Sequence, residues 1–302
     1  MSMKKFYANL GLLFVALTWG LNPPVMKVGL LDMPPFTYNA LRILIAAISA
    51  GVLLYFSGTY KKFEPSDLRK LLKYSLIGYC GFQLLLIIGL RFTNSTNSAL
   101  IFSLLPLSVA IINRVCKNEK VAKSFIIGVT LSLIGVILII SNSGLGFTPN
   151  NLGVLGDLIL LIGQGFYAYY TVFSKELQHK YSLFQISFFV ILANSVLFLL
   201  LAIPELVQHS LRQVTTAAFL SALFSGVLPV CLGNFFWIWG TTIIGSTKVS
   251  AYSNLTPIFA AIGGYLFLDE KITILQVVGG LIIIGGFSLA LGKTKDEGDL
   301  SS

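Results

Sequence analysis

Apolar runs long enough to cross a bilayer recur along the whole chain, and they limit its possible folds more than any other feature. A membrane-spanning helix needs about 20 mostly apolar residues. Ten stretches between polar breaks meet this length, at approximately 7–30, 35–57, 68–90, 95–115, 122–141, 152–174, 183–203, 215–238, 245–268 and 272–291. The run from Phe125 to Ile140 is apolar on every side, whereas the strands of a membrane barrel alternate apolar and polar residues. We therefore predict an all-α integral membrane protein with ten transmembrane helices.

The composition agrees with a chain that is dissolved in lipid. Of the 302 residues, 55% are hydrophobic and only 11% are charged, whereas soluble domains have about 25% charged residues. The net charge of +9 could indicate a nucleic-acid partner, but basic residues of membrane proteins collect in cytoplasmic loops. We therefore interpret the excess as a sign of orientation, and expect a lipid bilayer but no nucleic acid as a partner.

The distribution of the 21 Lys and Arg residues predicts how the chain is oriented. With the N-terminus placed in the cytoplasm, most of them fall in connections on the cytoplasmic side, and Arg42 lies within a helix. Four fall on the other side: Lys27, Arg91, Arg212 and Lys271. This bias predicts that both termini are cytoplasmic. We expect a multi-pass protein of the cell inner (plasma) membrane, with residues 292–302 as a cytoplasmic tail.

The second half of the chain repeats the first. Moving the sequence by 151 positions superposes Pro, Gly, Cys and Glu-Lys positions that two unrelated apolar helices would not share. The superposed pairs are Cys80 and Cys231, Gly89 and Gly240, Ser95-Thr96 and Ser246-Thr247, Pro106 and Pro257, Glu119-Lys120 and Glu270-Lys271, Gly128 and Gly279, and Gly135 and Gly286. A shift of 148 superposes Trp19 on Tyr167 and Lys27 on Lys175, so the first helices of the two halves correspond as well.

The repeats, at 7–141 and 152–291, each contain five predicted spans. Because five is odd, the two copies must be inverted relative to each other in the membrane. Inverted repeats are typical of secondary transporters, in which a site near the midplane is exposed to each side in turn. Duplication for folding alone is the alternative, but an inverted duplication supplies two equivalent gates and favours transport by alternating access.

Several short segments carry a family resemblance over about residues 7 to 291. These segments are Trp19-Gly20 with Asn22 and Lys27, Ala40-Leu41-Arg42, Leu104-Leu105-Pro106, Asn254-Leu255-Thr256-Pro257, and Leu268-Asp269-Glu270-Lys271 followed by paired glycines. With them the chain resembles the drug/metabolite transporter superfamily, in particular its ten-helix members made of two EamA domains. The resemblance implies an inner-membrane carrier that exports amino acids or other small metabolites. Hydrophobic or aromatic amino acids are the first choice, and phosphorylated or nucleotide-linked metabolites are the alternative.

The candidate substrate-binding residues are polar or aromatic side chains at membrane depth. Gln83 and Asn234 superpose in the 151-residue shift, and amides can both donate and accept hydrogen bonds, which suits a zwitterion. Tyr79 and Trp237 lie one helical turn from these amides and share their faces. The full set is Trp19, Asn22, Arg42, Tyr79, Gln83, Gln164, Tyr167, Tyr170, Asn234, Trp237, Tyr252 and Asn254. Interhelical hydrogen bonds for the amides, and core packing for the rings, are the alternatives.

Arg42 and a pair of prolines stand out within predicted helices. Arg42 lies about eight residues into its predicted helix. At the centre of a membrane helix its charge would cost about 3 kcal/mol on insertion scales. Its partner is either an anion on the substrate route or a structural group, such as helix carbonyls or the Asp157 carboxylate, and the resemblance favours the structural role. In the first helix, Pro23-Pro24 predicts a bend or break that frees backbone groups.

Other function classes lack their residues in this sequence. No Asp or Glu lies near the middle of a predicted span, so the usual proton relay and cation trap is missing. Small multidrug members of the same superfamily use such a carboxylate in their first helix, so the resemblance argues against cationic drug efflux by that mechanism. The sequence has no HExxH or GxSxG motif, and we expect no enzyme activity, no catalytic residues, no metal and no cofactor. A channel-like facilitator remains an alternative, although no ring of like charges is found. Whether the protein is a monomer or a homodimer is left open.

Overall fold

The computed structural model describes residues 3–90, 92, 101–117, 121–141, 151–208, 214–268 and 274–291. The described chain is helical and contains no strand. The helical segments of the first half are α1 (Met3–Asp32), α2 (Pro35–Ser57), α3 (Pro65–Lys73), η1 (Tyr74–Cys80), α4 (Gly81–Leu90), α6 (Leu105–Cys116) and α7 (Lys123–Ser141). Those of the second half are α8 (Asn151–Phe173), η2 (Ser174–Leu177), α9 (Leu183–Gln208), α10 (Thr216–Ser225), η4 (Gly226–Leu232), α11 (Gly233–Ile244), α12 (Ser246–Ala251), η5 (Tyr252–Leu255), α13 (Thr256–Leu268) and α14 (Ile274–Leu291).

Within the described chain, four helical segments are both long and apolar enough to cross a membrane. They are Pro35–Ser57, Pro65–Gly89, Leu183–Val207 and Thr216–Ile244. The helical, membrane-type architecture is as predicted, whereas the count of ten spans and the cytoplasmic termini stay predictions. Some predicted features lie outside the described residues, namely Ser95-Thr96, the Glu-Lys pairs at 119–120 and 270–271, and the tail 292–302.

The first helix does not break at its prolines. Helix α1 runs from Met3 to Asp32 with Pro23 and Pro24 inside it, so a break is ruled out, whereas the alternative, a bend, stays a prediction. Two adjacent prolines remove neighbouring N–H groups, which confines the disruption to one turn. Packing of α1 against α10, α11 and α13 keeps the remaining turns helical.

The third span of each repeat contains a π-helical segment at a corresponding place, offset by one residue in the 151-residue superposition. In the first repeat η1 leads into α4, and in the second η4 leads into α11. A π-helical turn inserts an extra residue into the hydrogen-bond ladder of an α-helix and is frequent at functional sites. Gln83 and Asn234 both lie in the first turn after this insertion. The superposed amides therefore have the same local backbone setting.

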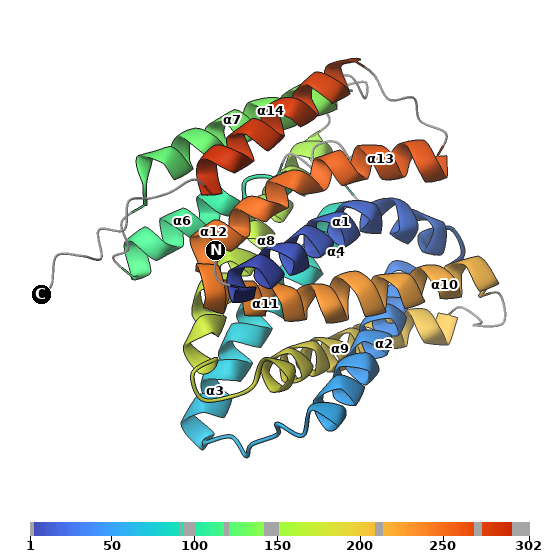
Figure 1. The fold of residues 1–302 in the computed structure, drawn as a ribbon. Helices are drawn as coiled ribbons and strands as arrows, with labels where there is room; N and C mark the ends of the chain where they lie inside the picture. The colour runs from blue at the N-terminus through green and yellow to red at the C-terminus, as the bar shows by residue number, and fades with distance from the viewer. Residues whose placement is uncertain are drawn as a thin grey trace, which may run out of the picture.

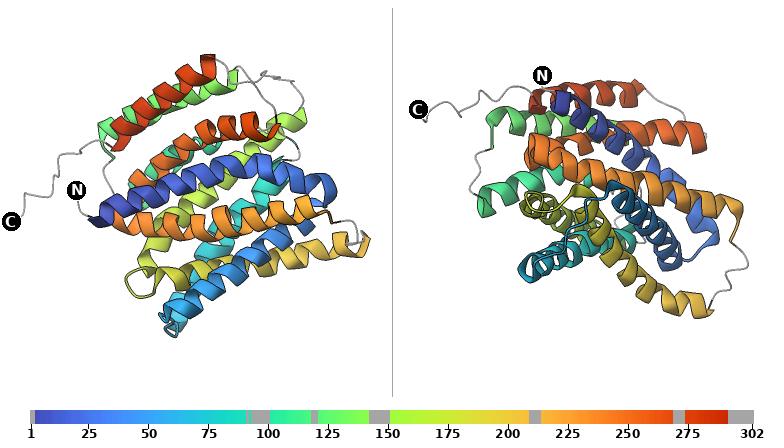
Figure 2. Two further views of the ribbon diagram at one scale, coloured as in Figure 1. Left: turned by 45° about the vertical axis from the view of Figure 1, so that its right-hand side comes forward. Right: turned by 60° about the horizontal axis from the view of Figure 1, so that its bottom comes forward.

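Helices α7 and α14, the last of each repeat, lie side by side through small residues (Figures 1 and 2). A Cβ added at Gly128 would lie 2.5 Å from the Gly286 carbonyl oxygen, and one added at Gly135 would lie 2.5 Å from that of Gly279. Gly128 superposes on Gly279, and Gly135 on Gly286. The contact of Gly128 with Gly286 and the contact of Gly135 with Gly279 are therefore equivalent in the two repeats. Such close packing at small residues is typical of membrane helices.

The other helices pack so that the first helix of each repeat lies against the third span of the other. Helix α1 contacts α10, η4 and α11, and α8 contacts η1 and α4. The second helices of the two repeats, α2 and α9, lie side by side (Figure 2). This reciprocal packing brings residues of α1, η1, α4, α8 and α11 together between the repeats, and the candidate site lies there.

Candidate functional site

Six aromatic side chains meet between the repeats and form what we call the aromatic cluster: Trp19, Tyr79, Phe82, Tyr167, Tyr170 and Trp237. The ring of Tyr167 is central. Its centroid lies 4.8 Å from Phe82, 5.7 Å from Trp19 and 5.9 Å from Trp237. The Trp19 and Trp237 rings lie 4.7 Å apart. These separations fall in the range in which aromatic pairs attract one another. Five of the twelve predicted residues are thus in one cluster.

The polar atoms of the aromatic cluster are only partly satisfied. Trp19 Nε1 donates to the Pro229 carbonyl oxygen at 3.1 Å, and Trp237 Nε1 donates to Thr171 Oγ1 at 3.0 Å. The Tyr170 hydroxyl donates to Asn234 Oδ1 at 2.8 Å. Among the described residues, however, the buried Tyr167 hydroxyl has no hydrogen-bond partner.

Atoms of buried side-chain amides also lack partners within the described chain. These atoms are Gln164 Oε1, Asn234 Nδ2, and the Oδ1 and Nδ2 atoms of both Asn254 and Asn194. Leaving a buried polar group unpaired costs free energy, and such groups in native structures usually have a partner such as water. Each of these atoms can therefore form a hydrogen bond with a water molecule or with a polar ligand that reaches it.

Arg42 lies beside the aromatic cluster in a network of neutral side chains. It is 2% exposed. Its Nε donates to Asn39 Oδ1, while its two terminal nitrogens donate to Ser225 Oγ and Gln83 Oε1, each at 3.1 Å. Ser225 Oγ in turn donates to Asn22 Oδ1 at 2.7 Å. The expected partners, helix carbonyls or a carboxylate, are wrong, since the hydrogen-bond acceptors of Arg42 are amide and hydroxyl oxygens of side chains. A structural role for Arg42 stays a prediction.

Tyr252 has other neighbours than the aromatic cluster. Its hydroxyl donates to Asn9 Oδ1 at 2.8 Å, and its ring packs against Phe287 at 4.8 Å. Asn254 lies in the same short segment, η5, and is 1% exposed. A substrate-binding role for these two residues stays a prediction, as it does for the other ten.

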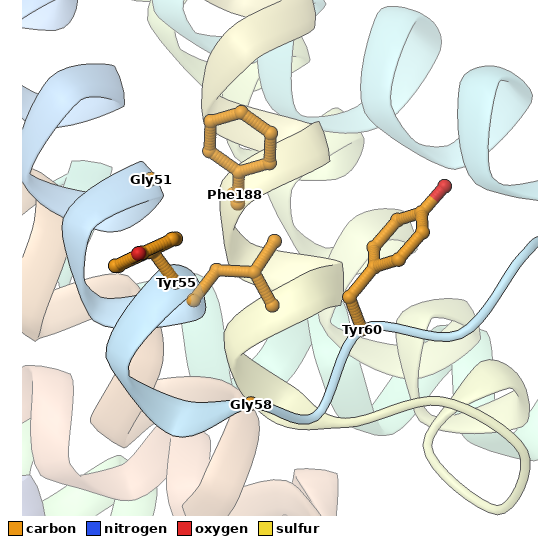
Figure 3. Close-up of a pocket in the computed structure, with 6 residues that line it drawn as sticks. Gly51, Tyr55, Gly58, Tyr60 and Phe188 are labelled. Atoms are coloured by element: carbon orange, nitrogen blue, oxygen red, sulfur yellow. The ribbon is translucent and has the colours of Figure 1, made fainter.

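A separate surface pocket of about 320 Å³ lies between α2 and α9 (Figure 3). Its lining is mostly apolar and consists of Gly51, Leu54, Tyr55, Gly58, Tyr60 and Phe188. None of the twelve predicted residues lines it. The candidate site is therefore the aromatic cluster with the adjoining Arg42 network, which lies between the repeats.

The model of the EamA-like transporter family matches residues 6–141 and 154–292. The chain belongs to the EamA-like transporter family. This membership confirms the resemblance seen in the sequence motifs.

Relatives of the chain bear transporter names without a substrate. "Uncharacterized transporter YoaV" of Bacillus subtilis (strain 168) is 28% identical and the match covers 92% of this chain and 94% of that protein. An "Uncharacterized transporter" of Archaeoglobus fulgidus is 25% identical over 94% of this chain and 97% of that one. A crystal structure with 17% identity superposes with a TM-score of 0.81, covering 94% of this chain and 98% of its own. That likeness supports the fold alone.

Contacts of the site cross between the two EamA matches. Arg42 belongs to the first match and Ser225 to the second, and the same holds for Trp19 and Trp237. A rearrangement of one EamA repeat against the other would therefore change these contacts directly.

Ion pairs also connect the two EamA matches, at the loop ends of α6, α8 and α3. Lys117 pairs with Glu176, and Lys180 pairs with Asp67 at 3.0 Å and with Glu64 at 3.3 Å. The hydrogen bonds to Asp67 and Glu64 raise the pKa of Lys180. Burial opposes ionisation of Glu176, but hydrogen bonds from Lys117 and Tyr74 outweigh it and lower the pKa of this carboxyl. Both shifts favour the charged forms, and the ion pairs connect the repeats at this end.

Sequence reasoning missed three buried polar residues. Asn39 precedes Arg42 by three residues, and this helical spacing could have identified it. Ser225 gave no such signal, because it comes from the other EamA match, 183 residues away. Asn194 is fully buried on α9 with both side-chain polar atoms unpartnered in the described chain, and as an amide in an apolar run it could have been noticed.

Proposed function

We propose that this EamA-family protein is a secondary transporter that exports small metabolites, with hydrophobic or aromatic amino acids as its cargo. The proposed place of action is the inner membrane, and the proposed mechanism is alternating access. The observation that carries the proposal is the contact of Trp19 with Tyr167. It joins equivalent positions of two repeats inside a cluster of aromatic rings that has unpartnered polar atoms beside it.

The chemistry of the aromatic cluster supports an amino-acid cargo with an apolar or aromatic side chain. Aromatic rings attract other rings at centroid distances of 4.5–7 Å. The unpartnered Tyr167 hydroxyl and Asn234 Nδ2 can bond polar groups of the cargo. Because the cargo is then bound by one residue from each repeat, its binding site changes when the repeats rearrange, as alternating access requires.

The ion pairs of Lys117 and Lys180 support the gating part of the proposal. They join the repeats at the end that the charge bias predicts to be cytoplasmic. Opening that end would break them, so they favour the arrangement closed on the cytoplasmic side. Cargo enters from the cytoplasm once these pairs separate.

A phosphorylated or nucleotide-linked metabolite is the second candidate cargo, and one observation favours it. Arg42 is a buried positive charge next to the aromatic cluster, and phosphate groups are frequently bound by Arg. A single cation is a weak match for a dianionic phosphate, which is why the amino acid is preferred.

Counterflow in proteoliposomes tests the proposal. Vesicles preloaded with unlabelled L-tryptophan, L-phenylalanine, glucose 6-phosphate or AMP receive the same compound in labelled form outside. We expect saturable, accelerated uptake for the aromatic amino acids and chemically unchanged cargo. Uptake that rises linearly with concentration and shows no trans-acceleration would support a channel-like facilitator. Exchange restricted to the phosphorylated compounds would support the second cargo.

A further inference from the structure

Arg42 is a buried cation whose hydrogen-bond partners are all neutral. Its three bonds go to the side-chain oxygens of Asn39, Gln83 and Ser225. The electrostatic neighbours of its guanidinium are the hydroxyls of Tyr38 and Tyr79, which carry no charge at neutral pH. A charge in a membrane interior is costly unless it is compensated. The network orients the guanidinium without neutralising it.

The described carboxylates on neighbouring elements have other partners. Glu205 on α9 accepts hydrogen bonds from the backbone N–H and the hydroxyl of Thr37, at 2.7 and 3.0 Å. Asp32 at the end of α1 accepts from the Thr215 hydroxyl. The ion pairs found in the described chain involve Lys117 and Lys180 and do not include Arg42.

The guanidinium has hydrogen-bonding capacity left for an anion. Arg carries five N–H donors, and the bonds to Asn39, Gln83 and Ser225 engage one on each nitrogen. Within the described chain, one N–H on each terminal nitrogen is therefore available to a further acceptor. Two parallel N–H groups on the terminal nitrogens match the two oxygens of a carboxylate.

We propose that Arg42 forms an anion site within the membrane and that the carboxylate of the cargo is its counter-ion. This inference rests on the proposed function and makes it more specific, since it requires the transported species to carry a carboxylate. Asn39 positions the guanidinium from within α2, while Gln83 and Ser225 hold it from one repeat each.

The position of this site relative to the aromatic cluster fits a cargo with two different ends. Gln83 follows Tyr79 by one helical turn, and Asn22, linked to Arg42 through Ser225, follows Trp19 by three residues on α1. A carboxylate at Arg42 would therefore leave an attached side chain near the rings of Tyr79 and Trp19. Because Ser225 and Gln83 belong to different repeats, the bound carboxylate would lie at a contact between the repeats.

Binding of four related probes to the purified full-length protein tests the anion site. The probes are 3-phenylpropanoate, L-phenylalanine, L-phenylalaninamide and phenethylamine, and binding is measured as thermal stabilisation against concentration. The first two carry a carboxylate and the last two do not. We expect the apparent Kd of the carboxylates to be lower by about tenfold or more, as charge-assisted hydrogen bonds imply.

Variants connect this preference to Arg42. Arg42→Gln should abolish the preference for carboxylates, Arg42→Lys should retain a weaker one, and the exposed control Arg69→Gln should leave it unchanged. If Arg42→Gln does not fold, the comparison of probes on the unaltered protein and on Arg42→Lys still decides the matter.

Each contrary result has a separate meaning. Equal affinity for L-phenylalanine and L-phenylalaninamide overturns the anion site and leaves the aromatic cargo standing. Lack of stabilisation by all four probes overturns the proposed cargo and this inference with it. Stabilisation that rises when sodium methanesulfonate is replaced by sodium chloride, with no effect of the carboxylate probes, would assign the site to a free halide and overturn the cargo as counter-ion.

Discussion

The rings of Trp19 and Tyr167, which occupy equivalent positions in the two repeats, meet edge to face with their centroids 5.7 Å apart. If cargo stacks between the repeats, Trp19→Leu and Tyr167→Leu should each weaken its apparent affinity in counterflow by up to about tenfold, because an aromatic contact contributes about 0.5–1.5 kcal/mol beyond its buried area. Tyr55→Leu, at an exposed ring, is the matched control. If the cargo concentration at half-saturation is unchanged in both Trp19→Leu and Tyr167→Leu, these rings only pack the core.

The hydrogen bond from Tyr170 to Asn234 joins two fully buried residues, so removing one partner should be costlier than removing both. Asn234→Leu is expected to destabilise the protein by about 1 kcal/mol or more because it leaves the Tyr170 hydroxyl unpaired. Adding Tyr170→Phe should recover part of this loss, as measured by a double-mutant cycle of thermal unfolding. Strictly additive losses would mean that the bond contributes little in the membrane.

The contact between α7 and α14 offers a test in which two adjacent glycines differ. A Cβ at Gly286 would lie 2.5 Å from the Gly128 carbonyl oxygen, whereas one at Gly285 meets nothing within 4 Å. Gly286→Ala should therefore destabilise by about 1–3 kcal/mol through overpacking. Gly285→Ala should be neutral or slightly stabilising, since Ala favours helix. Equal melting temperatures of the two variants would contradict the close packing of these helices.

The lowered pKa of Glu176 predicts a dependence of stability on pH. Because its carboxyl is more acidic in the folded than in the unfolded protein, its stabilising contribution is present above the unfolded pKa of about 4.3 and is lost as the pH falls through the folded pKa. Glu176→Gln should thus melt below the unaltered protein at pH 7, and the difference should shrink below about pH 4. A difference that stays constant down to pH 3.5 would exclude ionisation of Glu176 as its cause.

The orientation inferred from the charge bias predicts which loops face the cytoplasm. In a Cys116→Ser background, which removes the exposed native thiol, single cysteines replace Lys61, Lys117 or Gly146, and intact cells are treated with an impermeant thiol reagent. We expect labelling at position 146 and protection at 61 and 117. Labelling at 61 without labelling at 146 would reverse the predicted topology.

Much of the fold could be predicted because its signals are local or repeated in the chain. Apolar length predicts membrane helices whatever their partners are. The superposition of Gly128 on Gly279 and of Gly135 on Gly286 marks the duplication, and the structure uses these same glycines where α7 and α14 touch. The repeat likewise pairs Trp19 with Tyr167, and the structure places their rings in contact.

Only the tertiary structure decided what surrounds Arg42. The sequence by itself determined that a cation lies within an apolar helix, but it left open an anionic ligand, helix carbonyls or a carboxylate. Ser225 supplies an acceptor from 183 residues away, and helix periodicity carries no information about such a partner. The π-helical segments η1 and η4 could likewise not be predicted from the sequence. Periodicity reports which residues share one helix face, whereas the packing of α1 and α2 against the opposite repeat determines which faces meet.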